Sequence, residues 1–183
     1  MRYDVIGLNE VKTRERIYLP GYVCYRNTVT SDRHRGGTVV LVRRCLQSSV
    51  MCVDVKMKDQ IWLRLSHLAN VLLGFVYVPP TDSQYFNPIS FSYMQEKIIR
   101  GEEENCRVLI LGDLNARFGP SVRDILPSIV VPGSDNCTYP VIPDQVNRPN
   151  DNAQTMSTIC MEQKLVVINN LKIGEKHFKS NLT

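Results

Sequence analysis

The sequence lacks the features of a membrane, secreted or zinc-binding protein. Its longest apolar stretch, from about Val71 to Pro80, is roughly half of the ~20 residues that a membrane-spanning helix needs. Asp4 and Glu10 interrupt the apolar run at the amino terminus, which therefore does not resemble a secretory signal. The six cysteines include no Cys-x-x-Cys pair and no Cys/His cluster with zinc spacing. We expect a soluble, reduced, intracellular protein of the nucleus or cytoplasm, not secreted and without a membrane partner.

Low-complexity blocks, internal repeats and domain linkers are also absent from the sequence. The chain has 183 residues, of which 43% are hydrophobic and 22% are charged. This composition is typical of globular proteins and excludes disordered and fibrous classes. The length is sufficient for one domain with a sizeable core, so we predict a single domain over residues 1–183.

The net charge of +4 is unevenly distributed along the chain. Residues 1–50 carry a net charge of +5, and the remainder is close to neutral. A local basic patch suits a polyanionic partner such as nucleic acid, although a solvated loop and strand edge would give the same pattern. The arginines that concentrate the charge are Arg26, Arg33, Arg35, Arg43 and Arg44.

Short β-branched and alternating runs dominate the first 80 residues and predict a series of strands. The run Thr38–Val42 is continuously apolar, which is typical of a strand buried on both faces. The other predicted strands are 4–8, 21–25, 50–55, 61–65 and 71–78.

The period then changes and indicates helices that alternate with strands. Phe91, Met94 and Ile98 have helical spacing, and Gly101 is expected to cap the carboxyl end of that helix. A buried strand is predicted over 108–111, a second helix around Met156, and a final strand over 165–168. Adjacent strands followed by helix–strand alternation indicate a mixed α/β layered fold.

Polar residues follow or end three of these strands, namely Glu10, Tyr77, and Asp113 with Asn115. Carboxylates and amides at strand ends can meet at one rim of a sheet, and oxygen ligands of this kind suit Mg²⁺ rather than zinc. Magnesium with few protein ligands is typical of phosphate chemistry. Each residue also has a structural interpretation: a solvated strand end for Glu10, a packed aromatic for Tyr77, and an Asx turn for Asp113 and Asn115.

Four segments, in this order, resemble the endonuclease/exonuclease/phosphatase superfamily, which has the DNase I-like fold. They are Asp4–Glu10 (DVIGLNE), Arg35–Val42 (RGGTVVLV), Phe75–Pro80 (FVYVPP) and Val108–Ala116 (VLILGDLNA). Within the superfamily they look most like the apurinic-type endonuclease domain of LINE-like non-LTR retrotransposons. The resemblance implies an α/β (α+β) fold with four layers, an α/β/β/α sandwich, and hydrolysis of DNA with Mg²⁺ or Mn²⁺.

The resemblance also implies roles for individual residues. Glu10 matches the metal-ligating glutamate, and Tyr77 matches a tyrosine that hydrogen-bonds near the scissile phosphate. Asp113 matches the aspartate that positions or deprotonates the attacking water, and Asn115 matches an asparagine that contacts the phosphate. Such groups would stabilise the charge of a pentacoordinate phosphorane and align an in-line water.

Two further residues, Arg35 and Asn152, are predicted to contact the substrate. The family also has an asparagine-bearing first strand, a late aspartate strand and a Ser-Asp-His segment, none of which we identify in this sequence. The segment Ser31–His34 contains an inserted arginine and lies in an early loop, so it is not expected to replace the histidine.

We therefore expect an incomplete domain that lacks the first and last strands. Its expected function is that of a fragment of a Mg²⁺-dependent DNA endonuclease, impaired or inactive as this chain. The alternatives are a non-catalytic retrotransposon-derived remnant that binds nucleic acid weakly, and a superfamily phosphatase or deadenylase.

Overall fold

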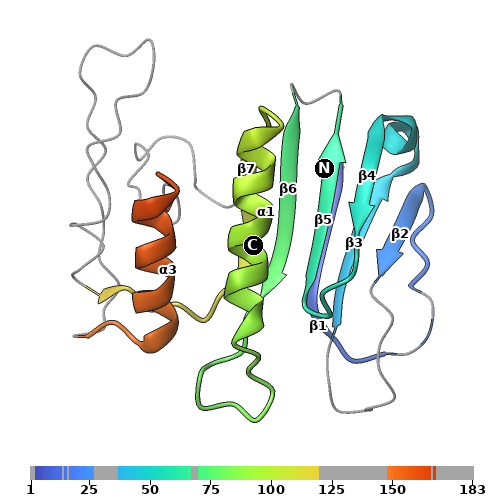
Figure 1. Cartoon of the computed structure of the whole chain (residues 1–183). Helices are drawn as coiled ribbons and strands as arrows, with labels where there is room; N and C mark the ends of the chain where they lie inside the picture. The colour runs from blue at the N-terminus through green and yellow to red at the C-terminus, as the bar shows by residue number, and fades with distance from the viewer. Residues whose placement is uncertain are drawn as a thin grey trace, which may run out of the picture. The chain divides into compact units, whose positions relative to one another are not determined.

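The computed structural model describes residues 3–13, 15, 17–26, 37–66, 70–119, 148–165 and 167. The chain divides into two compact units, Met1–Asn115 and Ala116–Thr183. The first unit holds two β-sheets and a helix, and the second unit holds one described helix (Figure 1). The predicted mixed α/β fold with more than one sheet is therefore confirmed, whereas the single domain over residues 1–183 stays a prediction.

Sheet A is antiparallel and contains β1 (Val5–Val11), β3 (Gly37–Arg43) and β2 (Tyr22–Arg26), in that order. The central strand β3 is buried from its first residue to its sixth, as its continuous apolar run predicted. A 3-10 helix, η1 (Arg44–Ser49), follows β3.

Sheet B has the order β4 (Val50–Asp54), β5 (Gln60–Leu65), β6 (Val71–Tyr77) and β7 (Arg107–Asp113). The first three strands pair antiparallel, as strands joined by short turns can. Strands β6 and β7 pair parallel, and helix α1 (Ile89–Glu103) lies between them in the chain. A parallel pair needs a crossover of this kind.

The two sheets pack face to face on a shared apolar core. Gly7 of β1 shows how closely they approach, because a Cβ there would lie 2.2 Å from a ring carbon of Phe75 in β6. The buried side chains of this core come from β3, β5 and β6: Val40, Val42, Ile61, Leu63, Leu65, Leu73 and Phe75.

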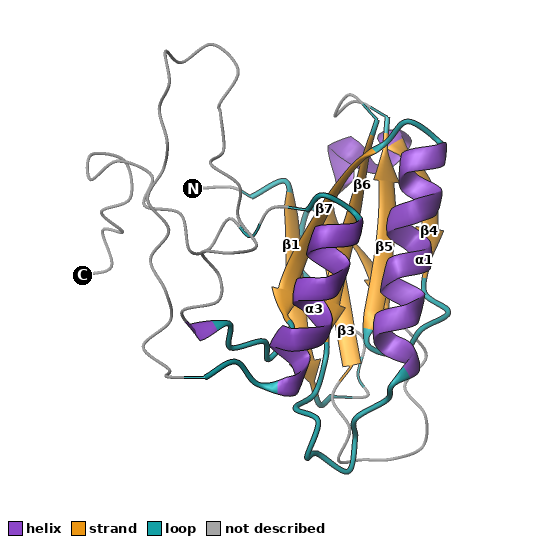
Figure 2. Cartoon of the chain, turned by 60° about the vertical axis from the view of Figure 1, so that its left-hand side comes forward, coloured by secondary structure: helices purple, strands orange, loops and turns teal. Residues whose placement is uncertain are grey.

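Helix α1 lies against the opposite face of sheet B (Figure 2). The Gln60 amide in β5 donates a 2.7 Å hydrogen bond to the backbone carbonyl of Ser90 in α1. Trp62 is 2% exposed and donates to the Gln60 amide oxygen at 3.1 Å. The buried polar groups of β5 are thus paired within the helix–sheet interface, which avoids the penalty of leaving them unpaired.

Gly101 lies inside α1 and does not cap its carboxyl end, so that prediction is wrong. A Cβ at position 101 would lie 2.9 Å from side-chain carbons of both Leu72 and Val108. The glycine therefore allows the helix to approach sheet B closely, and Glu104 occupies the C-cap.

A nearly buried ion pair joins β4 to α1. The Lys97 ammonium lies 2.5 Å from Asp54 Oδ2, with both side chains less than 15% exposed. Asp54 also accepts hydrogen bonds from the Tyr93 hydroxyl at 2.9 Å and the backbone N–H of Lys56 at 2.9 Å. Burial opposes ionisation of Asp54, but these donors and the Lys97 charge outweigh it and lower the carboxyl pKa.

Strand β7 is less buried than the sequence predicted. Val108, Leu109 and Ile110 are half-buried, and Leu111 is 41% exposed. Among the described residues β7 is the outermost strand of sheet B, so only β6 pairs with it. The predicted final strand, 165–168, lies partly outside the described residues, and Leu165 and Val167 are not in a strand.

The second unit contains helix α3 (Asp151–Glu162), as the spacing around Met156 predicted. The Asn150 side chain accepts hydrogen bonds from the backbone N–H groups of Ala153, at 3.1 Å, and Arg117, at 3.0 Å. Asn150 thereby caps the amino terminus of α3 and links it to the backbone of Arg117. No helix in the described part of the chain is both long enough and apolar enough to cross a membrane.

Candidate functional site

The carboxyl ends of β6 and β7 place two of the predicted site residues side by side. Tyr77 and Asp113 are direct partners in the parallel register. The backbone N–H of Val78 donates a 2.9 Å hydrogen bond to the carbonyl of Asp113, which extends the pairing beyond the last residue of β6. The expected meeting of strand ends at one rim of a sheet is therefore observed for these two residues.

Asn115 is held next to this pair by an Asx turn. Its backbone N–H donates to Asp113 Oδ1 at 2.9 Å, and its side-chain amide donates to the carbonyl of Val78 at 2.9 Å. Its φ of 47° lies in the left-handed region, which asparagine tolerates better than most residues. The Asx turn considered from the sequence is present, and it also orients the Asp113 carboxylate at the rim.

Gly112 allows β7 to approach β6 at this point. Its φ is 139°, and a Cβ there would lie only 1.9 Å from the carbonyl oxygen of Val76. Only glycine fits such a position. The glycine of the Gly-Asp-Leu-Asn segment is thus required by the geometry that precedes Asp113.

Glu10 reaches the site from the other sheet. The sequence predicted that Glu10 ends its strand. In the structure Glu10 lies within β1, at a bulge between Leu8 and Val11. Its φ of 56° is unusual for a residue with a side chain. The Tyr77 hydroxyl donates a 2.5 Å hydrogen bond to the exposed Glu10 carboxylate. The structure therefore joins residues of β1 and β6 that are 67 positions apart in the sequence.

Sequence reasoning missed Asn9, the neighbour of Glu10. The Asn9 amide nitrogen lies 3.4 Å from the carbonyl of Val76, and the hydroxyl of the buried Thr38 lies 3.5 Å from its amide oxygen. Consecutive residues of β1, Asn9 and Glu10, thus contact consecutive residues of β6, Val76 and Tyr77. The Asn-Glu pair at the end of an apolar run was the available signal.

Acidic groups surround the Tyr77 phenol. Burial raises its pKa well above the usual value, and the hydrogen bond to Glu10 and the charges of Glu10, Asp113 and Asp59 raise it further. Asp59, also missed from the sequence, accepts the Tyr77 backbone N–H on its carbonyl at 2.8 Å. Tyr77 consequently stays protonated near neutral pH, so it acts as a hydrogen-bond donor and not as a base.

The donor set is compatible with a hard divalent cation. Glu10 presents an exposed carboxylate, and all groups at the rim offer oxygen ligands. Mg²⁺ usually takes one or two carboxylates and completes its shell with water and phosphate oxygens. Among the described residues, no group of three His, Cys, Asp or Glu side chains forms a metal cage. The rim could therefore hold a divalent metal ion, with Glu10 as a ligand and with water and a phosphate completing the shell.

The other two site residues predicted from the sequence are Arg35 and Asn152. Arg35 lies outside the described residues, as do His34, His67 and His177. Asn152 belongs to the second unit, where it is fully buried in α3. Substrate contact by Arg35 and Asn152 therefore stays a prediction.

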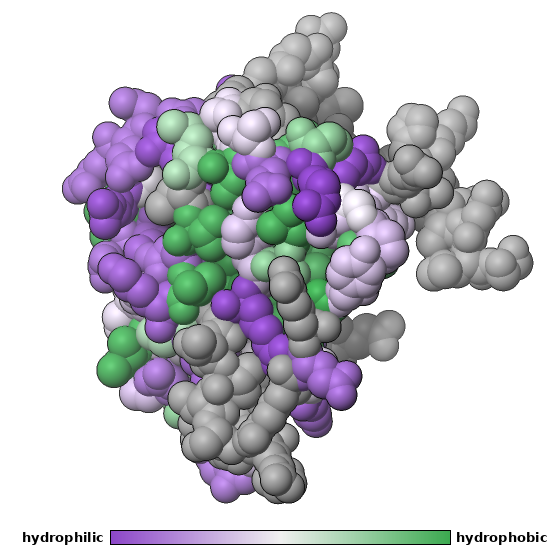
Figure 3. All heavy atoms as spheres, turned by 90° about the vertical axis from the view of Figure 1, so that its right-hand side faces the viewer, coloured by the Kyte–Doolittle hydropathy of each residue, from purple (hydrophilic) through white to green (hydrophobic). Residues whose placement is uncertain are grey.

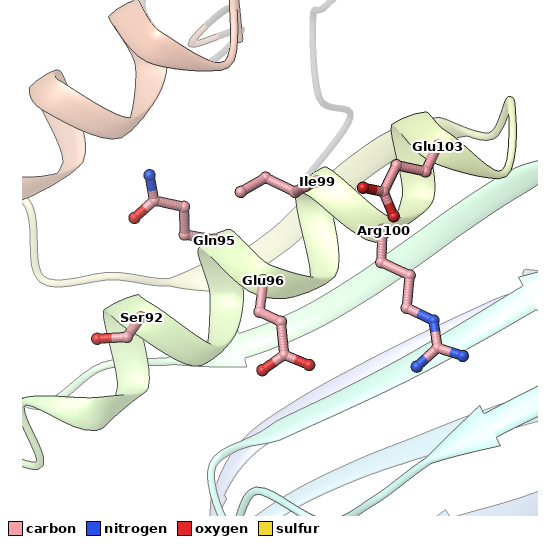
Figure 4. A pocket seen from close by; sticks show the side chains of 6 residues that line it. All are labelled: Ser92, Gln95, Glu96, Ile99, Arg100 and Glu103. Atoms are coloured by element: carbon pink, nitrogen blue, oxygen red, sulfur yellow. The ribbon is translucent and has the colours of Figure 1, made fainter.

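A separate open hollow lies along the exposed face of α1, and none of the residues at the rim lines it (Figure 4). All of its described lining side chains come from α1, and one of them, Arg100, is paired with Glu104 at 3.2 Å. A hollow on one helix face offers few convergent groups. Its lining residues are Ser92, Gln95, Glu96, Ile99, Arg100 and Glu103.

The two packed sheets and the acidic rim between β1, β6 and β7 are compatible with a hydrolase of nuclease or phosphatase type. Residues 1–145 match the endonuclease/exonuclease/phosphatase family, and the chain belongs to this family. The matched span includes Glu10, Tyr77, Asp113 and Asn115. Members of the family generally depend on divalent metal ions. Comparison with curated proteins gave no significant match.

Proposed function

We propose that the rim formed by Glu10, Tyr77, Asp113 and Asn115 is the phosphodiesterase site of a DNA endonuclease of the LINE-like retrotransposon type. The observation that carries the proposal is the 2.5 Å hydrogen bond between Tyr77 and Glu10. It brings the proposed metal ligand of sheet A to the end of sheet B where Asp113 and Asn115 lie. The four ordered sequence segments support DNA as the substrate.

Each residue has a separate task in this proposal. Glu10 would hold a Mg²⁺ or Mn²⁺ ion, which when bound supplies positive charge beside the phosphate oxygens. The exposed Asp113 carboxylate would orient the attacking water and accept its proton. Tyr77 has one phenolic proton, which its hydrogen bond to Glu10 directs at the carboxylate. Tyr77 would therefore fix the rotamer of Glu10 before the substrate arrives.

The Asx turn would serve the same reaction by holding two groups in place. The backbone N–H of Asn115 fixes one oxygen of the Asp113 carboxylate, so the side chain approaches the phosphate in one orientation. Holding a catalytic group in the orientation that the reaction needs can account for much of an enzyme's rate enhancement. The side chain of Asn115, anchored to Val78, would contact the phosphate.

The experiment is nicking of supercoiled plasmid by the full chain with Mg²⁺ or Mn²⁺, with and without EDTA. Glu10→Ala and Asp113→Ala should each lower the nicking rate about 10²-fold or more. Glu103→Ala removes an exposed carboxylate from α1 and should leave the rate unchanged, which makes it the matched control.

The same experiment separates the alternative functions. If the wild-type chain does not nick the plasmid but binds DNA in a salt-sensitive manner, it is a non-catalytic nucleic-acid-binding chain. Hydrolysis of a soluble inositol phosphate or of poly(A) in preference to plasmid would identify a phosphatase or a deadenylase. The retrotransposon origin is tested independently by whether the flanking nucleotide sequence encodes a reverse transcriptase.

A further inference from the structure

Among the described arginines of the first 50 residues, one exposed guanidinium is not held by other described groups. Arg26 donates to backbone carbonyls that include that of Glu15, at 2.8 Å. Arg43 is paired with Asp4 at 2.9 Å. Arg44 is exposed, and no carboxylate within the described ranges pairs with it. Arg44 therefore remains available for an anionic ligand.

Arg44 lines a hollow formed by three segments of the first unit. Residues 17–19 form one wall, 22–24 of β2 form the second, and Arg44 and Gln47 of η1 complete it. Its volume of about 230 Å³ is below the ~300–1,000 Å³ typical of sites for drug-sized ligands. The hollow therefore suits a single ring system. Figure 3 shows that the face on the β2 side carries hydrophobic residues among hydrophilic ones.

The walls of this hollow are held in place by hydrogen bonds. The Tyr22 hydroxyl donates to the backbone carbonyl of Tyr3 at 2.6 Å, which fixes the orientation of the Tyr22 ring. The backbone N–H of Arg44 donates to the carbonyl of Gly21 at 2.7 Å, and that of Tyr22 donates to Leu19 at 3.1 Å. A wall that is already ordered loses little entropy when a ligand binds.

The lining groups have complementary chemistry for a nucleotide. The Tyr18 side chain is 77% exposed and offers an aromatic surface on which a base can stack. Arg44 can bind a phosphate through paired N–H donors. The carboxamide of Gln47 can both donate to and accept from the polar edge of a base. An unstacked base fits this set, whereas a base in a duplex has both faces covered by its neighbours.

The hollow and the acidic rim lie at opposite ends of sheet A. Tyr22 pairs with Arg43 at one end of β3, and Val11 pairs with Gly37 at the other. Gly37 and Arg43 are six residue steps apart along the extended β3, which corresponds to about 20 Å. Binding at the hollow can therefore be measured without cleavage at the rim.

We propose that the hollow binds one unstacked base of a single-stranded nucleic acid, with Tyr18 stacking on the base and Arg44 contacting the adjacent phosphate. The inference rests on the proposed function only in that nucleic acid is the ligand of both the hollow and the rim. The shared ligand chemistry is a base next to a phosphate, which single-stranded DNA and RNA both supply.

The test is fluorescence anisotropy of labelled dT10 and U10 with the full chain in EDTA, which prevents cleavage. Tyr18→Ala should weaken binding about fivefold or more, whereas Tyr18→Phe should restore it because the ring is kept. Arg44→Gln should reduce the slope of log K against log salt by about 0.7, the value for one phosphate contact on a single strand. Arg100→Gln on α1 is the charge-matched control and should change neither quantity.

Asp113→Ala separates failure of this inference from failure of the proposed function. Unchanged dT10 binding by that variant, with nicking lost, is expected if the two sites are distinct. Equal affinity of wild type, Tyr18→Ala and Arg44→Gln for both oligonucleotides would overturn the inference, even if plasmid nicking is robust. Weakened binding of a duplex but not of dT10 by Tyr18→Ala and Arg44→Gln would also overturn it. Circular dichroism of each variant establishes that the fold is retained.

Discussion

Replacement of Gly112 by alanine should destabilise the protein through a local overlap that the structure defines. The Cβ of an alanine would lie 1.9 Å from the Val76 carbonyl oxygen and 2.9 Å from its carbonyl carbon. Both are backbone atoms, so no side-chain rotation can relieve the contact. Separation to a normal contact distance requires a shift of β7 from β6 of at least about 1 Å.

The expected destabilisation has two contributions. The left-handed φ of 139° is unfavourable for alanine by about 1–3 kcal/mol. Displacement of β7 should add about 1–3 kcal/mol, as overpacking of a close-packed region does. The total is therefore about 2–6 kcal/mol, a large part of the ~5–15 kcal/mol that stabilises a typical domain.

Gly21→Ala is the matched control for this substitution. Gly21 also has a positive φ, of 83°, but a Cβ there would have no heavy atom within 4 Å. The control should therefore show only the backbone strain, about 1–2 kcal/mol. Urea unfolding can be followed by the fluorescence of Trp62, the single tryptophan, which is buried in sheet B. The reasoning is refuted if Gly112→Ala destabilises the protein no more than Gly21→Ala.

Two further predictions concern the ion pair of α1 and the residue beside Glu10. Lys97→Met should lower the free energy of unfolding by about 3 kcal/mol, because it leaves the nearly buried Asp54 carboxylate without its cationic partner. The pKa of Asp54 is lowered in the folded state. Asp54 therefore stabilises the folded protein above its unfolded-state pKa of about 4, and this contribution is lost as the pH falls through the folded-state pKa. Urea unfolding between pH 7 and pH 3 checks both points, and Asp54→Asn should show a weaker acid dependence than wild type. Asn9→Leu should weaken Mn²⁺ binding measured by electron paramagnetic resonance, whereas Mn²⁺ affinity equal to wild type would exclude a positioning role for Asn9 beside Glu10.

The elements predicted best were those whose local pattern allows one interpretation. Thr38–Val42 was expected to be a fully buried strand because five apolar or β-branched residues follow one another, and β3 is buried there. The helical spacing of Phe91, Met94 and Ile98 likewise gave α1. Gly101 was misassigned because glycine is common both at helix C-caps and where a helix packs closely against a sheet. The sequence does not show that Leu72 lies opposite Gly101.

The burial of β7 could not be predicted because it depends on the order of strands in sheet B. The run Val108–Leu111 is as apolar as a central strand, yet its strand is the outermost one described in that sheet. Strand order arises from pairing between distant segments, which a local pattern does not encode. The Asp113–Asn115 turn, by contrast, is a local structure, and its Asx interaction was anticipated from the sequence.

The conformation of β1 explains how the neighbouring side chains of Asn9 and Glu10 both reach β6. In a regular strand, successive side chains point to opposite faces of the sheet. Gly7 faces Phe75 of sheet B, so the regular pattern would direct Asn9 toward sheet B and Glu10 away from it. The bulge, with φ of 56° at Glu10, breaks this alternation, and both residues contact β6.

A departure from a local rule at this position is therefore what creates the site. The strained φ of Glu10 is unfavourable in isolation and is maintained by contacts that only the packed sheets provide. These are the hydrogen bond from Tyr77 and the contact of the Asn9 amide with Val76, both of which come from β6 in sheet B. It follows that formation of the acidic rim is coupled to packing of the two sheets. Substitutions that separate the sheets, even far from the rim, should displace the Glu10 carboxylate before they unfold the chain.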